Sequence, residues 1–222
     1  MVLRRVNRFV VEVSIGGSRL RAHINNTGRL ERILEPGTRG LCRPLKRGTR
    51  TSYRLWALDY RGSYAIIDTR LQENSLAEAI SRGLIPWARH CVVFERWPKL
   101  GSSRLDLALK CSDSVVYIET KSAVMPGPRG SAMYPDCPTP RGRRHIEELI
   151  EHVERGGKAI LVFIAALPGA SMFMVNRSAD PALADLAARA IRVGVDVRAI
   201  GIEYDISSGY IVLYDPDLPV AV

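Results

Sequence analysis

Apolar and polar residues alternate in short runs over the first 70 residues of the chain. The run RFVVEVSI (8–15) is followed by a Gly-Gly turn and the alternating run SRLRAHI (18–24). Farther along, TSYRLWALDY (51–60) and SYAIIDT (63–69) flank an Arg-Gly turn in the same way. Short alternating runs separated by glycine are typical of strands joined by tight turns. Several such strands in a small module predict a closed or nearly closed β-barrel.

The period of the pattern changes after this module. The segment NSLAEAISRGL (74–84) repeats its apolar residues every three or four positions, which predicts an amphipathic helix. Asn74 or Ser75 is expected to cap the start of this helix. We therefore predict two domains, a barrel over residues 1–72 and a second domain over residues 73–222.

The second domain alternates between strand-like and helix-like patterns. Predicted strands cover residues 103–109, 114–122, 159–167, 195–205 and 209–214, predicted helices cover 143–157 and 181–194, and 123–142 is expected to be a long loop. The strand after the first of these helices is apolar throughout, as in a strand buried on both faces. Strands that alternate with helices predict an α/β domain, and the whole chain is α+β when the barrel is included.

Positive charge is concentrated in the first third of the chain. Residues 1–75 contain 15 Lys and Arg against 6 Asp and Glu, a net +9, whereas residues 76–222 contain 17 of each. A basic module attached to a neutral one suits a polyanionic partner such as nucleic acid, because arginine neutralises phosphates and releases counterions. The alternative is an arginine-rich solvated surface, since only 5 of the 32 cationic residues are lysine.

The cysteines and the apolar runs bear on where the protein acts. Cys42, Cys91, Cys111 and Cys137 are too far apart in the sequence for a metal-binding or redox pair spacing. The N-terminus has no long apolar stretch after its charges, and no apolar run is long enough to span a membrane. We expect a cytoplasmic protein with reduced cysteines and no membrane partner.

The candidate chemistry lies on the first two predicted strands of the second domain. Asp106 interrupts an apolar stretch, and Glu119 and Lys121 follow another. Residues two apart on a strand face the same way, and a hairpin would bring Asp106 beside Glu119. Paired carboxylates suit a hard divalent cation such as Mg²⁺ or Mn²⁺. A neighbouring lysine can orient or deprotonate a water and stabilise charge on a phosphate.

A salt bridge at the ends of two strands is the plainer interpretation, because an Asp followed by Glu-x-Lys often arises by chance. Two features favour the metal site. The carboxylates interrupt apolar strands, where burial is costly unless they are paired or hold a metal. The order of helices and strands around them is also the one that this chemistry uses.

These residues resemble the PD-(D/E)xK nuclease core, in which an Asp opens the site and E-x-K follows on the next strand. The chain also resembles the sugar fermentation stimulation protein A family, through stretches that fall in the family's order and cover nearly the whole sequence. They are HINNTGRL (23–30), PG (36–37), IIDTRLQENSLAEAI (66–80), SRLDLAL (103–109), ETKS (119–122), YPDCPTPRGRRHIEEL (134–149) and AILVFIAAL (159–167). The chain has Asn25, Arg29 and Pro140 where Pro, Ser and Glu are usual in the family.

The resemblance implies an N-terminal OB-like β-barrel followed by a nuclease-like α/β domain with a mixed central sheet. It also implies nucleic acid as a partner, since the family is associated with DNA binding and sugar-use control and its members are described as DNA/RNA nucleases. By position, the family's metal and catalytic residues fall on Asp106, Glu119 and Lys121.

Other residues are weaker candidates. Glu78 and Asp136 are candidate additional metal ligands; the alternatives are an exposed helix acid and a loop cap. The candidates for nucleic-acid contact are Arg21, Arg29, Arg54, Arg104, Arg141, Arg143, Arg144 and His145. Tyr53, Trp56 and Tyr64 either stack on bases or fill the barrel core, and we favour the core for Trp56.

The leading hypothesis is a Mg²⁺- or Mn²⁺-dependent phosphodiester hydrolase whose barrel holds the nucleic acid while the second domain cuts it. The alternative is a DNA-binding regulatory protein that keeps the fold with little or no hydrolysis. An enzyme acting on a small anionic metabolite fits the basic charge less well. The sequence leaves DNA or RNA preference open and is compatible with a homo-oligomer.

Overall fold

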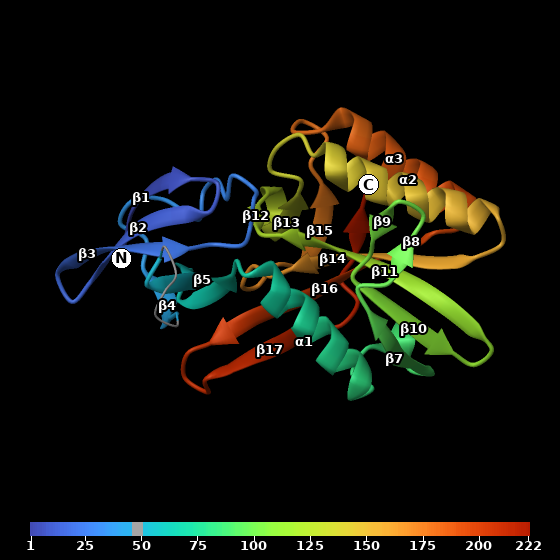
Figure 1. Cartoon of the computed structure of the whole chain (residues 1–222), viewed down its shortest axis with the longest axis horizontal. Helices are drawn as coiled ribbons and strands as arrows, with labels where there is room; N and C mark the ends of the chain where they lie inside the picture. Colours follow the sequence, from blue (N-terminus) through green and yellow to red (C-terminus); the bar gives the residue numbers. More distant parts are fainter. Residues whose placement is uncertain (46–50) are drawn as a thin grey trace.

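The computed structural model describes residues 1–45 and 51–222. The N-terminal strands gather at one end of the molecule, and the remaining strands and two of the helices form a larger body at the other end (Figure 1). Helix α1 (Thr69–Ser81) lies beside the strands of both parts.

The described residues of the N-terminal part form six strands. They are β1 (Val2–Asn7), β2 (Val10–Ile15), β3 (Ser18–His23), β4 (Gly40–Pro44), β5 (Tyr53–Tyr60) and β6 (Ser63–Ile66). The four strands expected from the alternating runs are present, and Gly16-Gly17 turns β2 into the antiparallel β3. The pattern does not predict β1 or β4, because each pairs with a single neighbour and buries few of its side chains.

Alternation along β5 sorts its side chains onto two faces. Leu55 and Ala57 are fully buried, whereas Trp56 between them is half-buried and faces away from the barrel core. Successive residues of a strand point to opposite faces, so the alternation that places Leu55 in the barrel core places Trp56 outside it. The expectation that Trp56 fills the barrel core is therefore wrong.

The larger body has its own strands and short helical turns. They are η1 (Pro86–Ala88), β7 (Cys91–Arg96), β8 (Lys99–Leu100), β9 (Ser103–Arg104), β10 (Leu107–Cys111), β11 (Ser114–Ala123), β12 (Met125–Pro126), η2 (Pro128–Gly130), β13 (Ser131–Tyr134), β14 (Lys158–Ala165), β15 (Met172–Val175), β16 (Asp196–Asp205), β17 (Tyr210–Asp215) and β18 (Val220–Ala221). Strands from both parts join one sheet of 12 strands, in which β6 meets β16 through the pair Tyr64–Tyr204.

The central strands of this sheet run in both directions. β11, β14 and β16 are parallel to one another, while β10 pairs antiparallel with β11 and with β7, and β17 pairs antiparallel with β16. The expectation of an α/β domain with a mixed central sheet is thus confirmed. β14 is buried along nearly its whole length, as its apolar run predicts.

Helix α1 begins earlier than its apolar face suggests. Asp68 is its N-cap and accepts a hydrogen bond from the backbone N–H of Leu71 at 3.1 Å. The caps expected from the sequence, Asn74 and Ser75, lie inside the helix. The polar first turn conceals this start, because periodic apolar residues begin only at Leu76. Gln72 and Glu73 therefore belong to the helix.

Two more helices pack against each other and cover one side of the sheet (Figure 1). Helix α2 (Pro140–Glu154) begins three residues before the predicted start at 143, because Thr139 caps it by accepting from the N–H of Gly142 at 3.1 Å. Helix α3 (Pro181–Val193) begins at its Asp180 cap and ends at Gly194, with φ of 98°, as predicted.

The stretch expected to be a long loop contains regular structure. It holds β12, η2 and β13, and β13 pairs with β15 in a second, four-stranded sheet. Proline and glycine conceal these strands in the sequence, because each is short and the parallel partner of β13 is distant along the chain. The loop prediction is wrong for this part.

Two cysteines are paired. Cys91 on β7 and Cys111 on β10 are register partners and form a disulfide, whereas Cys42 and Cys137 are free. The expectation of four reduced cysteines is therefore wrong for this pair, because a sequence separation of 20 conceals a direct cross-strand contact. Among the described residues, no helix is long and apolar enough to cross a membrane.

Candidate active site

The backbone turns out of β9 and into β10 at Asp106. Its Oδ2 accepts hydrogen bonds from the backbone N–H of Thr120 at 2.7 Å and from the Thr120 hydroxyl at 2.6 Å. Its own N–H donates to the carbonyl of Ile118 at 3.2 Å, which extends the β10–β11 hairpin. The predicted hairpin therefore brings Asp106 beside the Glu119–Lys121 segment.

Glu119 and Lys121 lie on the same face of β11 and are both buried, with side chains 4% and 8% exposed. The Lys121 ammonium donates a hydrogen bond to Glu119 Oε1. His145 of α2 lies 2.6 Å from the same oxygen through its Nδ1. Two cationic or polar groups thus meet at one carboxylate oxygen, while Glu119 Oε2 is buried without a hydrogen-bond partner in the described part of the chain.

The two faces of β11 serve different helices. Glu119 meets His145 of α2, whereas Ser122 accepts a hydrogen bond from the Gln72 amide of α1 at 2.9 Å. Residues an odd number of positions apart on a strand face opposite ways, so α1 and α2 lie on opposite sides of this strand. Asn26 of the barrel also donates to Ser122, at 3.3 Å, which ties the N-terminal part to the strand that carries the site.

Helix α1 supplies a third acid, Glu73, which the sequence reasoning missed. Glu73 lines the same cleft as Asp106 and Glu119 and senses the charge of both. Glu78, the acid chosen from the sequence, is 61% exposed, pairs with Arg82 and does not line the cleft. The Asp68 cap would have revealed Glu73, because a helix from Thr69 places Glu73 on the inner face with Leu76 and Ile80.

Burial and neighbouring charge shift the pKa values of these groups. Burial, reinforced by Asp106, raises the pKa of Glu73 to about 7. Burial, reinforced by the charge of Glu119, also raises the pKa of Asp106. Burial opposes ionisation of Glu119 and Lys121, but their mutual attraction outweighs it, so the pKa of Glu119 is lowered and that of Lys121 is raised. The pair is therefore ionised.

The cleft that contains these groups has a volume of about 600 Å³ and takes its walls from both parts of the chain. The barrel contributes Arg8 and the loop Asn25–Gly28. A Cβ on Gly28 would lie 2.6 Å from Asp136 Oδ2, so only glycine lets the two loops approach this closely. Asp136 Oδ2 also accepts the N–H of Leu30 at 2.7 Å, so this carboxylate joins the loops across the cleft.

The cationic candidates divide into two groups. Arg141 and His145 line the cleft, and the Arg141 guanidinium lies 3.4 Å from His145 Nε2. Arg143 lies 3.7 Å from the Asp180 carboxylate instead. The remaining candidates, Arg21, Arg29, Arg54, Arg104 and Arg144, do not line this cleft.

Tyr134 of β13 is another residue that the sequence reasoning missed. It lines the cleft, and burial raises the pKa of its hydroxyl despite the nearby charge of Lys121. A Cβ on Gly142 would lie 2.7 Å from this hydroxyl, which explains a glycine in the first turn of α2. No pattern in the sequence marks this contact, because it depends on the fold of the stretch expected to be a loop.

The donor set fits a hard divalent cation. Glu119 Oε2 is a buried carboxylate oxygen with no hydrogen-bond partner among the described residues, and burying such an atom is unfavourable unless something satisfies it. Both hydrogen bonds from Thr120 fall on one oxygen of Asp106, Oδ2. Among the described residues, however, no three His, Cys, Asp or Glu side chains are already arranged as a ligand group.

The fold and the cleft define the class of protein: an OB domain joined to a mixed α/β domain whose cleft gathers carboxylates around a buried lysine. The family model for the SfsA N-terminal OB domain matches residues 3–67, and the model for the sugar fermentation stimulation protein RE domain matches residues 70–208. The chain belongs to the sugar fermentation stimulation protein family.

Relatives are similar over most of their length. A sugar fermentation stimulation protein homolog of Pyrococcus furiosus is 44% identical over 99% of this chain and 94% of the relative. A homolog of Archaeoglobus fulgidus is 43% identical over 100% of this chain and 94% of the relative. The solved structure of Pyrococcus furiosus SfsA in complex with Ca²⁺ superposes with a TM-score of 0.94 at 43% identity and covers 100% of this chain and 94% of that one.

Proposed function

We propose that this protein is a nuclease that hydrolyses phosphodiester bonds with the help of a divalent cation held by Asp106 and Glu119. The observation that carries the proposal is Glu119 itself. One of its oxygens is bound by Lys121 and lies beside His145. The other oxygen is buried in a cleft and has no hydrogen-bond partner in residues 1–45 and 51–222. A purely structural salt bridge has no need for an unsatisfied buried oxygen.

Asp106 and Glu119 would hold the ion, and Glu73 is placed to approach it from α1. Mg²⁺ or Mn²⁺ would polarise a phosphoryl oxygen and make a bound water more acidic. The Pyrococcus furiosus relative was solved with Ca²⁺, another hard divalent cation that takes oxygen ligands. A relative that binds a hard divalent cation supports the proposal that this chain binds one too.

The residues of the chain then have separate tasks. Hydrolysis adds water to phosphorus, breaks one P–O bond to a sugar oxygen, and leaves that oxygen with a proton. Lys121 is charged, so it donates a hydrogen bond to a phosphate oxygen rather than accepting a proton from water. His145 holds Glu119 in place from α2. Arg141 at the cleft wall is available to a neighbouring phosphate.

The barrel would hold the nucleic acid. Arg8 lines the cleft and also a neighbouring groove with Arg5 and Arg29. These guanidiniums extend the basic surface of the barrel up to the cleft that contains Asp106. A polyanion bound along this surface would therefore bring a phosphate to the carboxylates.

A DNA-binding regulatory protein with little or no hydrolysis is the second candidate. This candidate is favoured because, among the described residues, no three His, Cys, Asp or Glu side chains are already arranged to hold a metal ion. In that case the Glu119–Lys121 pair is a buried structural ion pair.

The deciding experiment incubates the full chain with single- and double-stranded DNA and RNA, in Mg²⁺, Mn²⁺ or EDTA. The matched variants are Asp106→Asn, which keeps the size of the side chain, and Glu78→Gln, which changes an exposed acid on the adjacent helix. We expect cleavage with Mg²⁺ or Mn²⁺ and none in EDTA, with activity lost in Asp106→Asn and kept in Glu78→Gln. Binding of the same nucleic acids without cleavage by the wild type in either metal would favour the regulatory protein instead.

A further inference from the structure

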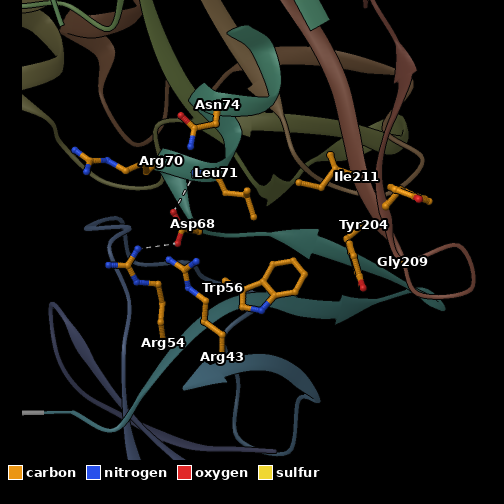
Figure 2. A pocket seen from close by; sticks show the side chains of 11 residues that line it. Arg43, Arg54, Trp56, Asp68, Arg70, Leu71, Asn74, Tyr204, Gly209 and Ile211 are labelled. Carbon is orange, nitrogen blue, oxygen red and sulfur yellow. Dashed lines mark hydrogen bonds and ion pairs between the residues drawn. The ribbon is translucent and has the colours of Figure 1, made fainter. Parts of the chain in front are cut away.

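A second pocket lies on the opposite side of the start of α1 from the cleft. We name it the Trp56 pocket, and its volume is about 410 Å³, within the roughly 300–1,000 Å³ of small-ligand sites. Its lining comes from strands β4 and β5 of the barrel, the first turns of α1, and the β16–β17 hairpin (Figure 2). Its residues are Arg43, Arg54, Trp56, Asp68, Arg70, Leu71, Asn74, Tyr204, Gly209, Tyr210 and Ile211.

Aromatic rings form one wall of this pocket. Trp56 lies edge-on against Tyr204, with ring centroids 4.8 Å apart and planes at 82° (Figure 2). This contact fixes the Trp56 indole without covering it. Tyr210 at the tip of the hairpin is 72% exposed. A half-buried Trp beside a freely exposed Tyr offers flat apolar faces to a planar ring.

Guanidinium groups form the other wall. Arg43, Arg54 and Arg70 line the pocket together with a single carboxylate, Asp68. Asp68 is already engaged, because it caps α1, accepts from Asn25 at 2.6 Å and lies 3.3 Å from Arg54. In the described part of the chain Arg43 and Arg70 form no ion pair within 4.0 Å, so the pocket has an excess of positive charge. The Arg70 guanidinium also lies over the Trp97 ring, 5.0 Å from its centroid, which leaves Arg43 as the less engaged of the two.

Flat aromatic faces next to an excess of guanidinium groups match the two parts of a nucleotide, the base and the phosphate. We propose that the Trp56 pocket binds one unpaired nucleotide of a nucleic-acid strand whose neighbouring segment lies in the cleft. The inference rests on the proposed function for the identity of the strand. The pocket and the cleft share a wall, since Asn25 lines the cleft and is hydrogen-bonded to Asp68, which lines the pocket.

Exposure of the cations favours a strand over a free nucleotide. Arg43 and Arg70 are exposed, so they suit a sugar–phosphate backbone that passes along the surface rather than a phosphate enclosed on all sides. A base that stacks here would be unpaired, because a paired base presents only its edge. The pocket would therefore favour single-stranded segments, ends or bulges beside the cleavage site.

The test measures binding in EDTA, so that it does not depend on cleavage. Single-stranded oligonucleotides carry the fluorescent base 2-aminopurine at successive positions, and its quenching reports stacking. The variants are Tyr210→Ala and Arg43→Glu, with Phe94→Ala and Arg192→Glu as controls for an exposed ring on β7 and an exposed cation on α3. Trp56→Phe keeps a ring in the pocket and should retain most of the quenching.

We expect quenching at a defined oligonucleotide position and an affinity loss of about 5- to 100-fold in Tyr210→Ala, the range for losing one stacked base. Arg43→Glu should weaken binding by at least as much, and the two controls by less than about 2-fold.

Equal affinity in Tyr210→Ala and Phe94→Ala, with no quenching at any position, would overturn the proposal. A nucleoside monophosphate that displaces the oligonucleotide at equal concentration would also overturn it, because the pocket would then hold a free nucleotide. Either result leaves the metal-dependent cleavage assay unaffected, so the two proposals fail separately.

Discussion

The two parts of the molecule use charge in opposite ways. The barrel carries its arginines on the outside; Arg4, Arg19 and Arg29 have side chains 61–63% exposed. The second part is neutral overall but buries Glu119 and Lys121 at 4% and 8% exposure. Exposed charges attract a polyanion over a distance and are screened by salt, whereas buried charges act strongly over a few ångströms. Net charge therefore indicates where a partner would bind, and buried charge indicates where chemistry would occur.

The largest effect is expected from Lys121→Met, which removes the buried charge and should slow cleavage. Methionine fills a similar volume without the ammonium, so a hydrogen bond made mainly in the transition state is lost. We expect single-turnover cleavage to slow by about 100-fold or more, while nucleic-acid affinity stays within a few fold. Both quantities are measured on the same preparation, with circular dichroism and thermal unfolding to confirm that it is folded.

The Lys121 variant also separates the two candidate functions. In a binding protein Lys121 would be a structural ion-pair partner, and cleavage by the preparation would not respond to its loss. Lys121→Arg is the second variant, and it should restore charge without full activity, because a planar guanidinium does not replace a compact ammonium. A Lys121→Met protein that is folded and cuts at the wild-type rate would remove the catalytic role from the buried pair.

Arg8→Ala tests the role of the exposed barrel charges, and its expected effect on nucleic-acid affinity is smaller. Arg8 lines both the cleft and the groove beside it, so its loss removes one phosphate contact. Affinity should fall by up to about 10-fold, and the slope of log K against log salt should shrink by about 1. Arg192→Ala on α3 is the matched control and should change neither quantity. An unchanged salt slope in Arg8→Ala would mean that the polyanion binds elsewhere.

Glu73→Gln gives the smallest effect and concerns stability. The folded-state pKa of Glu73 is about 7, above the usual 4.5, so the neutral form is favoured on folding. The stability that this provides is complete below about pH 4.5 and is lost as pH rises through 7. Without metal, the free energy of unfolding of Glu73→Gln should equal that of the wild type at pH 4 and exceed it at pH 8 by about 1 kcal/mol. This value is discounted because the side chain is only half-buried.

Urea unfolding of Glu73→Gln in EDTA at the two pH values measures this difference. Glu78→Gln on the same helix is the control, because Glu78 is exposed and should give no such pH-dependent gain. If Glu73 approaches the ion, Mn²⁺ should stabilise the wild type more than Glu73→Gln, so that the variant is no longer the more stable protein at pH 8. A difference in the free energy of unfolding between Glu73→Gln and the wild type that does not change with pH would contradict the raised pKa of Glu73.

Much of the fold could be predicted from the sequence because its signals are local. Gly16-Gly17 and the alternating runs mark the barrel strands, and Asp180, Pro181 and Gly194 mark both ends of α3. Asp106, Glu119 and Lys121 could be brought together because a hairpin with a short turn leaves few other arrangements. Each of these signals lies within a few residues of the element it defines.

The remainder depends on contacts between distant segments. Glu73 was missed because Asp68, a polar residue before a polar turn, does not reveal a helix by periodicity. The Cys91–Cys111 pair and the edge-on contact of Trp56 with Tyr204 depend on which strands become neighbours in the sheet. His145 was expected to contact phosphate, but it is buried against Glu119, because only the packing of α2 decides which way it faces.

A calorimetric titration of the full chain with Mn²⁺ tests the central claim most directly, since that claim is that the buried carboxylates hold a divalent cation. The wild type, Asp106→Asn and Glu78→Gln are titrated at pH 7.5 without nucleic acid. We predict a single class of sites in the wild type and in Glu78→Gln, with affinity lowered about 10-fold or more in Asp106→Asn, the scale of losing a metal-site interaction. Equal Mn²⁺ affinity in Asp106→Asn and the wild type, or no binding to either, would contradict the account.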